Sequence, residues 1–282
     1  MQKKGVLLAI SSLPGKYGVG DFGKEAKDFI KILAKNKMNI WQILPLNPIG
    51  YGHSPYQPFS SYAFDEIYIS LEDLKKRDLI SEYKGLPQKD KSDYEEARKI
   101  KEKAIYHAYE KFSKNKENMA KLEKFIKENP YVTEFSKFIT LKEFNNSVSW
   151  DNWTVFEKDR PGDYKYNYHK HAFAQMIMSE EWNDIRKFAN KNGIEIMGDV
   201  PFYVGYDSSD VYFHQDQFLL KDGKPTYVSG VGPDYFSEDG QRWGNPIYFI
   251  ENMYKDGYSF LIDRILNASK LYDIVRIDHF RA

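Results

Sequence analysis

The feature that most constrains this chain is the alternation of short apolar runs with segments of helical period. Apolar runs at positions 6–10 and 40–46 predict two strands, the second of which stops at Pro48. Strand, helix and strand within about 40 residues make a βαβ unit, whose strands are parallel and covered on both faces. We therefore expect a parallel sheet with a fully buried first strand. The residues that predict the helix are Ala26, Phe29, Ile30, Leu33 and Ala34.

The same pattern returns in the second half of the chain. One helix is predicted to end at Asn192 and Gly193, a typical C-terminal cap, and another helix precedes the last apolar run. Strands are predicted at 194–200 and 273–278, and all four strands should be parallel neighbours in one curved sheet. The residues that predict the two helices are Trp182, Ile185, Phe188 and Ala189, and then Phe260, Leu261, Ile265, Leu266 and Ala268.

Two insertions separate these units. Residues 71–149 are rich in Lys and Glu and are helical in pattern, with one apolar stripe. Residues 205–254 are rich in Gly and aromatic residues and show few periodic signals, so they are predicted to form a long ordered loop. The stripe in the first insertion consists of Ala97, Ile100, Ala104, Ala108 and Phe112.

The length of the chain then indicates which parallel fold to expect. A (β/α)8 barrel takes about 250 residues, or roughly 31 for each strand–helix unit. Here four strands and two insertions occupy all 282 residues, and no helix follows the fourth strand to cover it. We therefore expect an α/β fold that is the first half, about four strands, of a (β/α)8 TIM barrel with large insertions after strands two and three. Residues 1–282 would form a partial catalytic barrel domain; an open four-stranded α/β domain is the alternative.

Composition excludes several classes of function. The 41 basic and 41 acidic side chains cancel, so charge gives no reason to expect a nucleic acid or a membrane as partner. The absence of Cys excludes disulfides and thiolate chemistry, and the six His residues stand at no metal-binding spacing, so no metal is expected. No phosphate-binding glycine motif follows a strand, and no cofactor is expected. No apolar window approaches 18 residues, so we expect a soluble, cytoplasmic protein whose oligomeric state stays open.

Charged side chains gather where the predicted strands end, which is where the working residues of a parallel barrel lie. Asp199 follows the third strand, and Arg276, Asp278 and His279 stand at the end of the fourth; the loop around Tyr56 follows the second. Residues two apart face the same side of a strand, so Arg276 can touch Asp278. Such an Arg lowers the pKa of the carboxyl group and keeps it ionised, as a nucleophile requires. A structural ion pair explains the same spacing equally well.

Six groups of residues form motifs along the chain. They are 11–14 (SSLP) with 18–23 (GVGDFG), 41–46 (WQILPL), 54–61 (SPYQPFSS), 198–204 (GDVPFYV), 233–237 (PDYFS) with 240–246 (GQRWGNP), and 276–281 (RIDHFR). Each motif is a modest signal by itself. Together, and in this order, they resemble the 4-α-glucanotransferases (amylomaltases or disproportionating enzymes) of glycoside hydrolase family 77.

The resemblance implies a role for each residue of the site. Asp278 would be the catalytic nucleophile, forming a covalent glucosyl-enzyme in a retaining double displacement, and Arg276 would keep it ionised. His279, Asp199 and Tyr56 would bind the sugar beside the cleaved bond. The acceptor side would be covered by a loop at 231–246, within the insertion at 205–254, whose flat rings suit sugar faces. The loop residues concerned are Tyr235, Phe236, Gln241 and Trp243.

The resemblance also implies a substrate and a missing group. The substrate would be a maltodextrin or another starch-type α-1,4-glucan. The family needs a glutamic acid on a later strand as general acid/base, and that residue lies outside this chain, so we expect the chain to be inactive by itself. A related α-glucan hydrolase and a non-catalytic maltodextrin-binding module are the alternatives.

Overall fold

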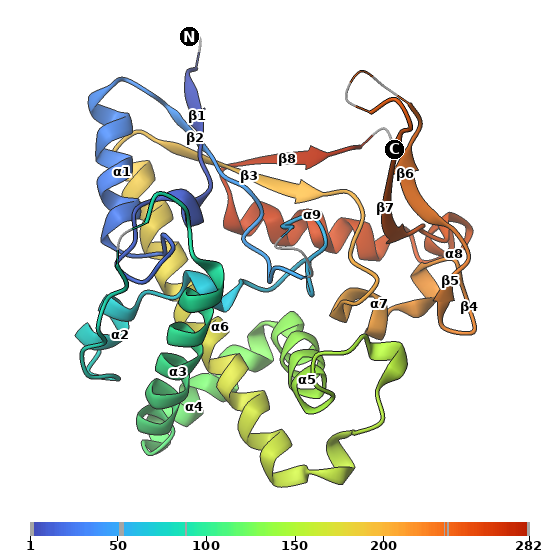
Figure 1. The fold of residues 1–282 in the computed structure, drawn as a ribbon, viewed down its shortest axis with the longest axis horizontal. Helices are drawn as coiled ribbons and strands as arrows, with labels where there is room; N and C mark the ends of the chain where they lie inside the picture. Colours follow the sequence, from blue (N-terminus) through green and yellow to red (C-terminus); the bar gives the residue numbers. More distant parts are fainter. Residues whose placement is uncertain (1–2, 51–53, 88, 234, 236, 281–282) are drawn as a thin grey trace.

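A four-stranded parallel sheet forms the centre of the structure, a computed structural model that describes residues 3–50, 54–87, 89–233, 235 and 237–280 (Figure 1). All three strand pairs are parallel, and Pro201 lies opposite Asp278 in the last of them. The prediction of four parallel neighbours is therefore confirmed. In sheet order the strands are β1 (Gly5–Leu7), β2 (Ile40–Gln42), β3 (Glu195–Pro201) and β8 (Ile274–Asp278).

The first two strands are shorter than predicted, and the burial predicted for the first is wrong. β1 ends at Leu7, whose surface is 55% exposed, and the chain enters a 3-10 helix, η1 (Ile10–Ser12), soon after. β2 ends at Gln42 instead of at residue 46. The physical reason is that β1 pairs with β2 alone, so it is an edge strand of this sheet and one of its sides is not covered by a neighbouring strand.

Helices α1 (Lys24–Lys35) and α6 (Pro161–Lys191) lie against the sheet with their predicted apolar faces buried. Gly193 has a φ of +74°, the left-handed conformation of a helix C-terminal cap, so the predicted end of α6 is confirmed. None of the helices that the structure describes is both long and apolar enough to cross a membrane. The side chains that these helices bury include Ala26, Ile30 and Leu33 of α1, and Trp182, Ile185 and Ala189 of α6.

Helix α9 (Ser259–Leu271) packs on the sheet with a face that matches the predicted one only in part. Its buried residues are Phe260, Arg264 and Ala268, at a spacing of four, whereas Ile265 and Leu266 are 42% and 51% exposed. Burial follows hydrogen bonding here: Arg264 is buried because backbone carbonyls surround its guanidinium group.

Residues 71–76 and most of 94–144 form helices, as the pattern of this insertion predicts, and Figure 1 shows these helices beside the long α6, below the sheet. The predicted stripe on α3 is buried at Ala97, Ala104, Ala108 and Phe112, while Ile100 is half-buried against the core. The helices are α2 (Leu71–Lys76), α3 (Tyr94–Phe112), α4 (Lys116–Glu128) and α5 (Pro130–Phe144). Short 3-10 helices occur at η3 (Glu66–Tyr68), η4 (Trp150–Asn152), η5 (Glu157–Asp159) and η6 (Gln215–Gln217).

The prediction of one long loop at 205–254 is wrong. This segment contains two antiparallel hairpins and two short helices, and aromatic side chains pack within it, for instance Tyr248 against Phe218 with ring centres 5.5 Å apart. Strands of two to six residues are too short to show a period, which is why they leave no trace in the sequence. The elements are α7 (Ser209–Phe213), β4 (Leu220–Lys221), β5 (Lys224–Pro225), β6 (Val228–Val231), β7 (Gln241–Pro246) and α8 (Ile250–Lys255).

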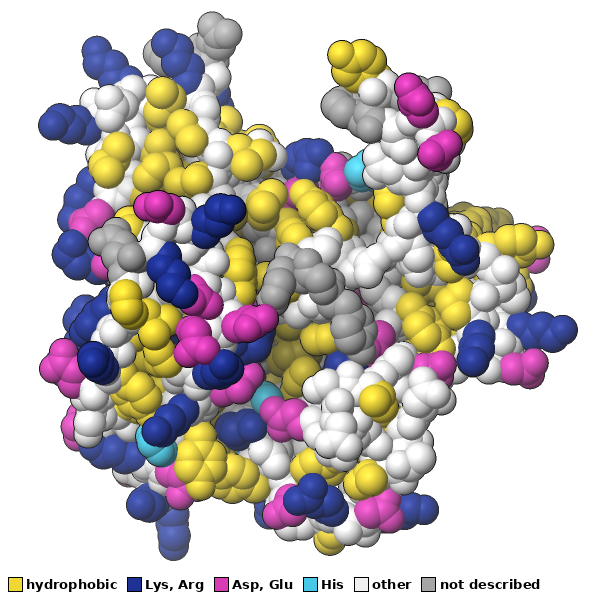
Figure 2. All heavy atoms as spheres, in the orientation of Figure 1, with side chains coloured by type: hydrophobic (Ala, Val, Ile, Leu, Met, Phe, Trp, Pro, Cys, Tyr) yellow, Lys and Arg dark blue, Asp and Glu magenta, His cyan; other side chains and the backbone are white. Residues whose placement is uncertain are grey.

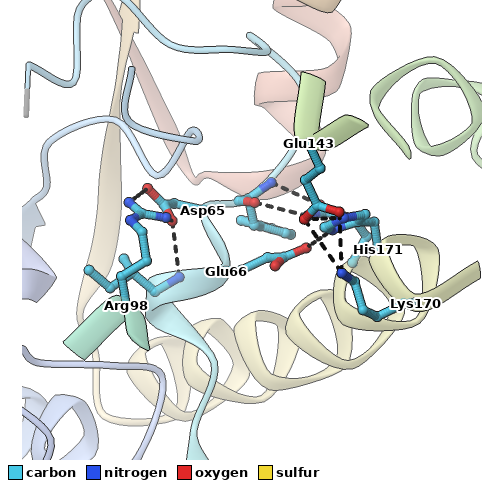
Figure 3. A network of polar contacts seen from close by, with 9 residues as sticks. Asp65, Glu66, Arg98, Glu143, Lys170 and His171 are labelled. Carbon is cyan, nitrogen blue, oxygen red and sulfur yellow. Dashed lines mark hydrogen bonds and ion pairs between the residues drawn. The ribbon is translucent and has the colours of Figure 1, made fainter. Parts of the chain in front are cut away.

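A group of charged side chains around the buried His171 joins the helical insertion to the segment after β2 (Figure 3). His171 Nδ1 lies 2.6 Å from Glu66 Oε1, and its Nε2 lies 3.0 Å from Glu143 Oε1. Burial alone would lower the pKa of His171, but the two carboxylates outweigh burial and raise it to about 9. Burial alone would raise the pKa of Glu143, but His171 and Lys170 lower it to about 2. The cluster is therefore charged over a wide range of pH.

Asp65, next to this cluster, anchors the loop that follows β2. Its carboxylate accepts hydrogen bonds from both terminal nitrogens of Arg98, at 3.1 and 3.0 Å, and from the backbone N–H of Ile49 at 2.8 Å. The side chain is only 1% exposed, so these partners offset the cost of burying its charge. The backbone at Ile49, from which the chain continues to Tyr56, is thus held in place by Asp65.

We predict that replacing His171 by Gln destabilises the protein in a pH-dependent way. Because the folded pKa is raised to about 9, the stabilisation is complete below the unfolded value and is lost as the pH rises through 9. The free energy of unfolding should fall by about 3 kcal/mol at pH 6 and by less at pH 9.5, as urea denaturation can measure. The exposed His107→Gln serves as the control and should show no such trend; a penalty for His171→Gln that grows between these pH values contradicts the prediction.

Candidate active site

A cavity of about 540 Å³ opens where β3 and β8 end, beside the β6–β7 hairpin. The hairpin projects from the body of the molecule (Figure 2) and forms one wall of the cavity. The volume of the cavity suits one or two sugar rings. The residues that line it are Ser54, Tyr56, Gln57, Pro201, Phe202, Tyr203, Gln241, Arg242, Trp243, Asn245, Asp278 and His279.

Arg276 joins two carboxylates at this end of the sheet. It lies opposite Asp199 in the register of β3 and β8, and two residues before Asp278 on its own strand. One terminal nitrogen donates to Asp199 and the other to Asp278. The two carboxylates therefore share one mouth, as the strand ends predict. The side chains of Asp199 and Asp278 are 1% and 14% exposed, so Asp278 is the one that faces the cavity.

Tyr56, from the loop after β2, contacts the same group of charged side chains. Its hydroxyl donates to Asp199 Oδ2 at 3.1 Å, and burial together with the charge of Asp199 raises the pKa of Tyr56 to about 12. Burial also raises the pKa of Asp199, although the hydrogen bonds from Arg276 and Tyr56 oppose this effect. Arg276 does lower the pKa of the Asp199 carboxyl group, but desolvation is the larger effect there, so the net shift is upward.

His279 and Trp243 connect the end of β8 to the hairpin. His279 has a φ of +52°, which turns the chain away from the strand and leaves its Nδ1 2.9 Å from Asp278 Oδ2. The imidazole and the Trp243 ring have their centres 4.5 Å apart. Gln241 accepts a hydrogen bond from the Trp243 indole at 3.1 Å, and the side-chain amide of Gln57 donates to the Trp243 carbonyl.

The structure brings together most, but not all, of the residues that the sequence analysis selects. Tyr56, Gln241, Trp243, Asp278 and His279 line the cavity, and Asp199 and Arg276 support them from the sheet. Tyr235 lies beyond the cavity lining and is 98% exposed. Phe236 lies outside the described residues.

Several lining residues were missed by the sequence analysis. Gln57, Phe202 and Tyr203 stand inside the quoted motifs, next to residues that were selected, so position within a motif was a usable signal. Asn245 donates to the carbonyl of Val204 at 2.8 Å and secures the hairpin to the segment after β3, a contact that no spacing reveals. Among the residues that the structure describes, no group of three or more His, Asp or Glu is placed to hold a metal ion.

A carboxylate at the carboxyl end of a parallel strand, beside a sugar-sized cavity with aromatic walls, defines the class of barrel glycosidases. The particular family follows from comparison with known proteins. The family model of glycoside hydrolase family 77, 4-alpha-glucanotransferase, matches residues 8–282, and the chain belongs to this family.

Individual relatives agree with this assignment. The 4-alpha-glucanotransferases of Clostridium butyricum and Thermus thermophilus are 41% and 38% identical over 96% and 98% of this chain. This chain spans 59% and 58% of their lengths.

Solved structures show the same relation. An amylomaltase from Streptococcus agalactiae, in complex with acarbose, matches 100% of this chain and 60% of its own, with a TM-score of 0.94 and 33% identity. The amylomaltase of Corynebacterium glutamicum shares the fold, with a TM-score of 0.73 at 18% identity. The predicted half of a TIM barrel is therefore confirmed.

We predict that replacing Arg276 by Met raises the pKa of Asp199 further. Arg276 is the main group that opposes the effect of burial on this carboxyl, so its loss leaves desolvation unopposed except by Tyr56. The titration of the carboxyl carbon of Asp199 in a ¹³C NMR experiment should shift to higher pH. The exposed Arg242→Met is the matched control and should leave the titration in place. A titration that stays unchanged in the Arg276→Met variant contradicts the ion pair.

Proposed function

We propose that the complete protein containing this chain is a 4-α-glucanotransferase that moves α-1,4-glucan segments between maltodextrins. The observation that carries the proposal is the environment of Asp278: it is the one carboxylate in the described cavity lining, and Arg276 and His279 hold it. Family membership supports the reaction, and the acarbose complex of the Streptococcus agalactiae relative supports an oligosaccharide as ligand.

In the proposed reaction Asp278 is the nucleophile. Its carboxylate oxygen attacks C1 of the donor sugar, the C1–O bond to the leaving chain breaks, and that oxygen takes a proton from a general acid. The 4-hydroxyl of an acceptor chain then attacks C1, loses its proton to the same group, and releases Asp278. Arg276 stabilises the ionised carboxylate before each cycle, and His279 holds its second oxygen in place.

The remaining residues bind sugar in this proposal. Tyr56 lines the cavity and offers its hydroxyl group to sugar, and Asp199, buried behind it, holds that hydroxyl in place through their hydrogen bond. The hairpin that carries Gln241 and Trp243 covers the acceptor side, where the indole ring gives a flat apolar face. Tyr235 belongs to the same hairpin loop and is proposed to meet the acceptor chain farther out; Phe236 is proposed for acceptor binding from its motif alone.

The general acid is proposed to lie outside this chain. Retaining glycosidases place two carboxyl groups about 5–5.5 Å apart on either side of the cleaved bond. The described lining has only Asp278, because Asp199 is buried and already bonds Arg276 and Tyr56. The relatives are longer than this chain, which spans 59% of the Clostridium butyricum enzyme, so they have room for a second carboxyl group.

Replacing Asp278 by Asn in the complete protein should abolish transfer. An amide cannot form the covalent intermediate, so we expect the rate of disproportionation of maltotriose to fall by at least about 10⁴-fold, as analysis of glucose and longer maltodextrins can show. Asp239→Asn, an exposed carboxylate on the β6–β7 hairpin, is the control and should retain activity. An active Asp278→Asn variant refutes the nucleophile assignment, and glucose and maltose without longer chains from the unmodified protein would indicate a hydrolase.

The 282-residue chain by itself should not disproportionate maltotriose. A positioned acid contributes about 10²–10⁴-fold to such a reaction, and the described residues of the cavity lining supply no second carboxyl group. The same assay, with the complete protein as the positive control, measures this. A rate in the ordinary range for enzymes, about 1–10³ s⁻¹, would show that no group outside the chain is required.

A further inference from the structure

Arg264 is a buried cation behind the wall of the candidate active site. It belongs to α9, an outer helix, yet it is only 5% exposed and stands on the helix face that meets the sheet. It does not line the cavity. Apolar residues of the same helix, such as Ile265 and Leu266, face outward instead. A charged group in such a position needs partners, and here the partners identify its role.

The guanidinium group bonds to three separate segments. Its Nη2 donates to the carbonyl of Pro201 at 2.6 Å, and its Nη1 donates to the carbonyl of Phe202 at 2.8 Å and to the Tyr248 hydroxyl at 2.7 Å. Its Nε donates to the Ser61 hydroxyl at 3.1 Å. Four of the five N–H groups of an arginine therefore have acceptors, in the planar fork that only this side chain presents.

Each of the three segments carries part of the cavity wall. Residues 201–203 are the end of β3 and the wall after it, Ser61 closes the loop that holds Tyr56, and Tyr248 follows the lining residue Asn245. Arg264 thus bonds to three segments, each of which also carries residues of the cavity lining.

The partners of Arg264 also form hydrogen bonds with one another and with neighbouring residues. The Tyr248 hydroxyl, which accepts from Arg264, donates to the Phe202 carbonyl at 2.5 Å. The carboxylate of Asp210 accepts from the backbone N–H of Ser61 at 2.8 Å and from the Ser61 hydroxyl, and it is 2% exposed. A network that satisfies four of the five N–H groups of Arg264 favours one geometry, whereas the loss of one member leaves buried groups unpaired.

We propose that Arg264 is a positioning residue for glucan transfer: it holds the loop after β2, the end of β3 and the segment after β7 in the one arrangement that forms the sugar cavity. This inference rests on the proposed function. Arg264 touches no reacting atom and acts through the walls that carry Tyr56, Phe202 and Tyr203. Because a displacement of about 1 Å at a reacting centre can lower a rate by about 100-fold, the effect should appear mainly in kcat.

The first test replaces Arg264 by Met in the complete protein, with Lys270→Met on the exposed side of α9 as the matched control. With maltotriose as substrate, at a temperature where circular dichroism shows both variants folded, Arg264→Met should lower kcat by about 10–100-fold and change KM little. The control should keep both parameters. A folded Arg264→Met variant with the kcat of the unmodified protein overturns the inference.

A milder variant keeps the test decisive if Arg264→Met does not fold. Tyr248→Phe retains the ring but removes the hydroxyl between Arg264 and Phe202, so kcat should fall by about 3–10-fold without a change in KM. Tyr254→Phe, 72% exposed on α8, is its control. An unchanged kcat in Tyr248→Phe contradicts the inference.

Where both variants fold, the double variant should be scarcely slower than Arg264→Met, and fully multiplicative effects would mean that the two residues act independently.

The unmodified protein separates the two proposals. If it does not lengthen maltotriose, the proposed function is wrong before any variant is compared. If it is active and the Arg264→Met and Tyr248→Phe variants match it, only the positioning role is wrong.

Discussion

The candidate site depends on the two ion pairs that Arg276 makes across the ends of β3 and β8. Asp199 and Asp278 would repel each other at one mouth if no cation lay between them, and a single guanidinium group bonds both. Sheet register places all three, because Arg276 stands opposite Asp199 and two residues before Asp278. The proposed nucleophile is therefore positioned by backbone hydrogen bonds of the sheet, and the loops need only supply groups that bind sugar.

The loops, in turn, are held from behind by buried charges. Asp65, with Arg98, anchors the chain after β2, and Arg264 joins that loop to the end of β3 and to the segment after β7. Such buried ion pairs and hydrogen bonds add little net stability, since desolvation offsets their attraction. They define the arrangement of the loops instead, because these hydrogen bonds can all form together in only one arrangement. The shape of the cavity therefore depends on Asp65, Arg98 and Arg264, which do not line it.

The sequence predicts the parallel sheet, α1, α6 and the helical insertion correctly, because each depends on a period that extends over many residues. It fails where burial or order depends on distant neighbours. The first strand has a buried pattern but lies at a sheet edge, and α9 buries Arg264 in place of Ile265 because carbonyls from another segment surround it. Tyr235, selected through its motif, is almost fully exposed at 98%.

For the site, sequence alone determined which residues stand at strand ends, and so that Asp199, Arg276, Asp278 and His279 meet at one mouth; parallel strands leave no other arrangement. Only the tertiary structure decided which carboxylate faces the cavity. Asp199 is buried and bonded to Tyr56, whereas the Asp278 side chain stays partly exposed. This difference arises from packing between distant segments, because Tyr56 and Asp199 are more than 140 residues apart in the sequence. Spacing along the chain predicts which residues share a strand face, but it does not predict the desolvation of a carboxyl group, because desolvation depends on the residues that the fold packs around it.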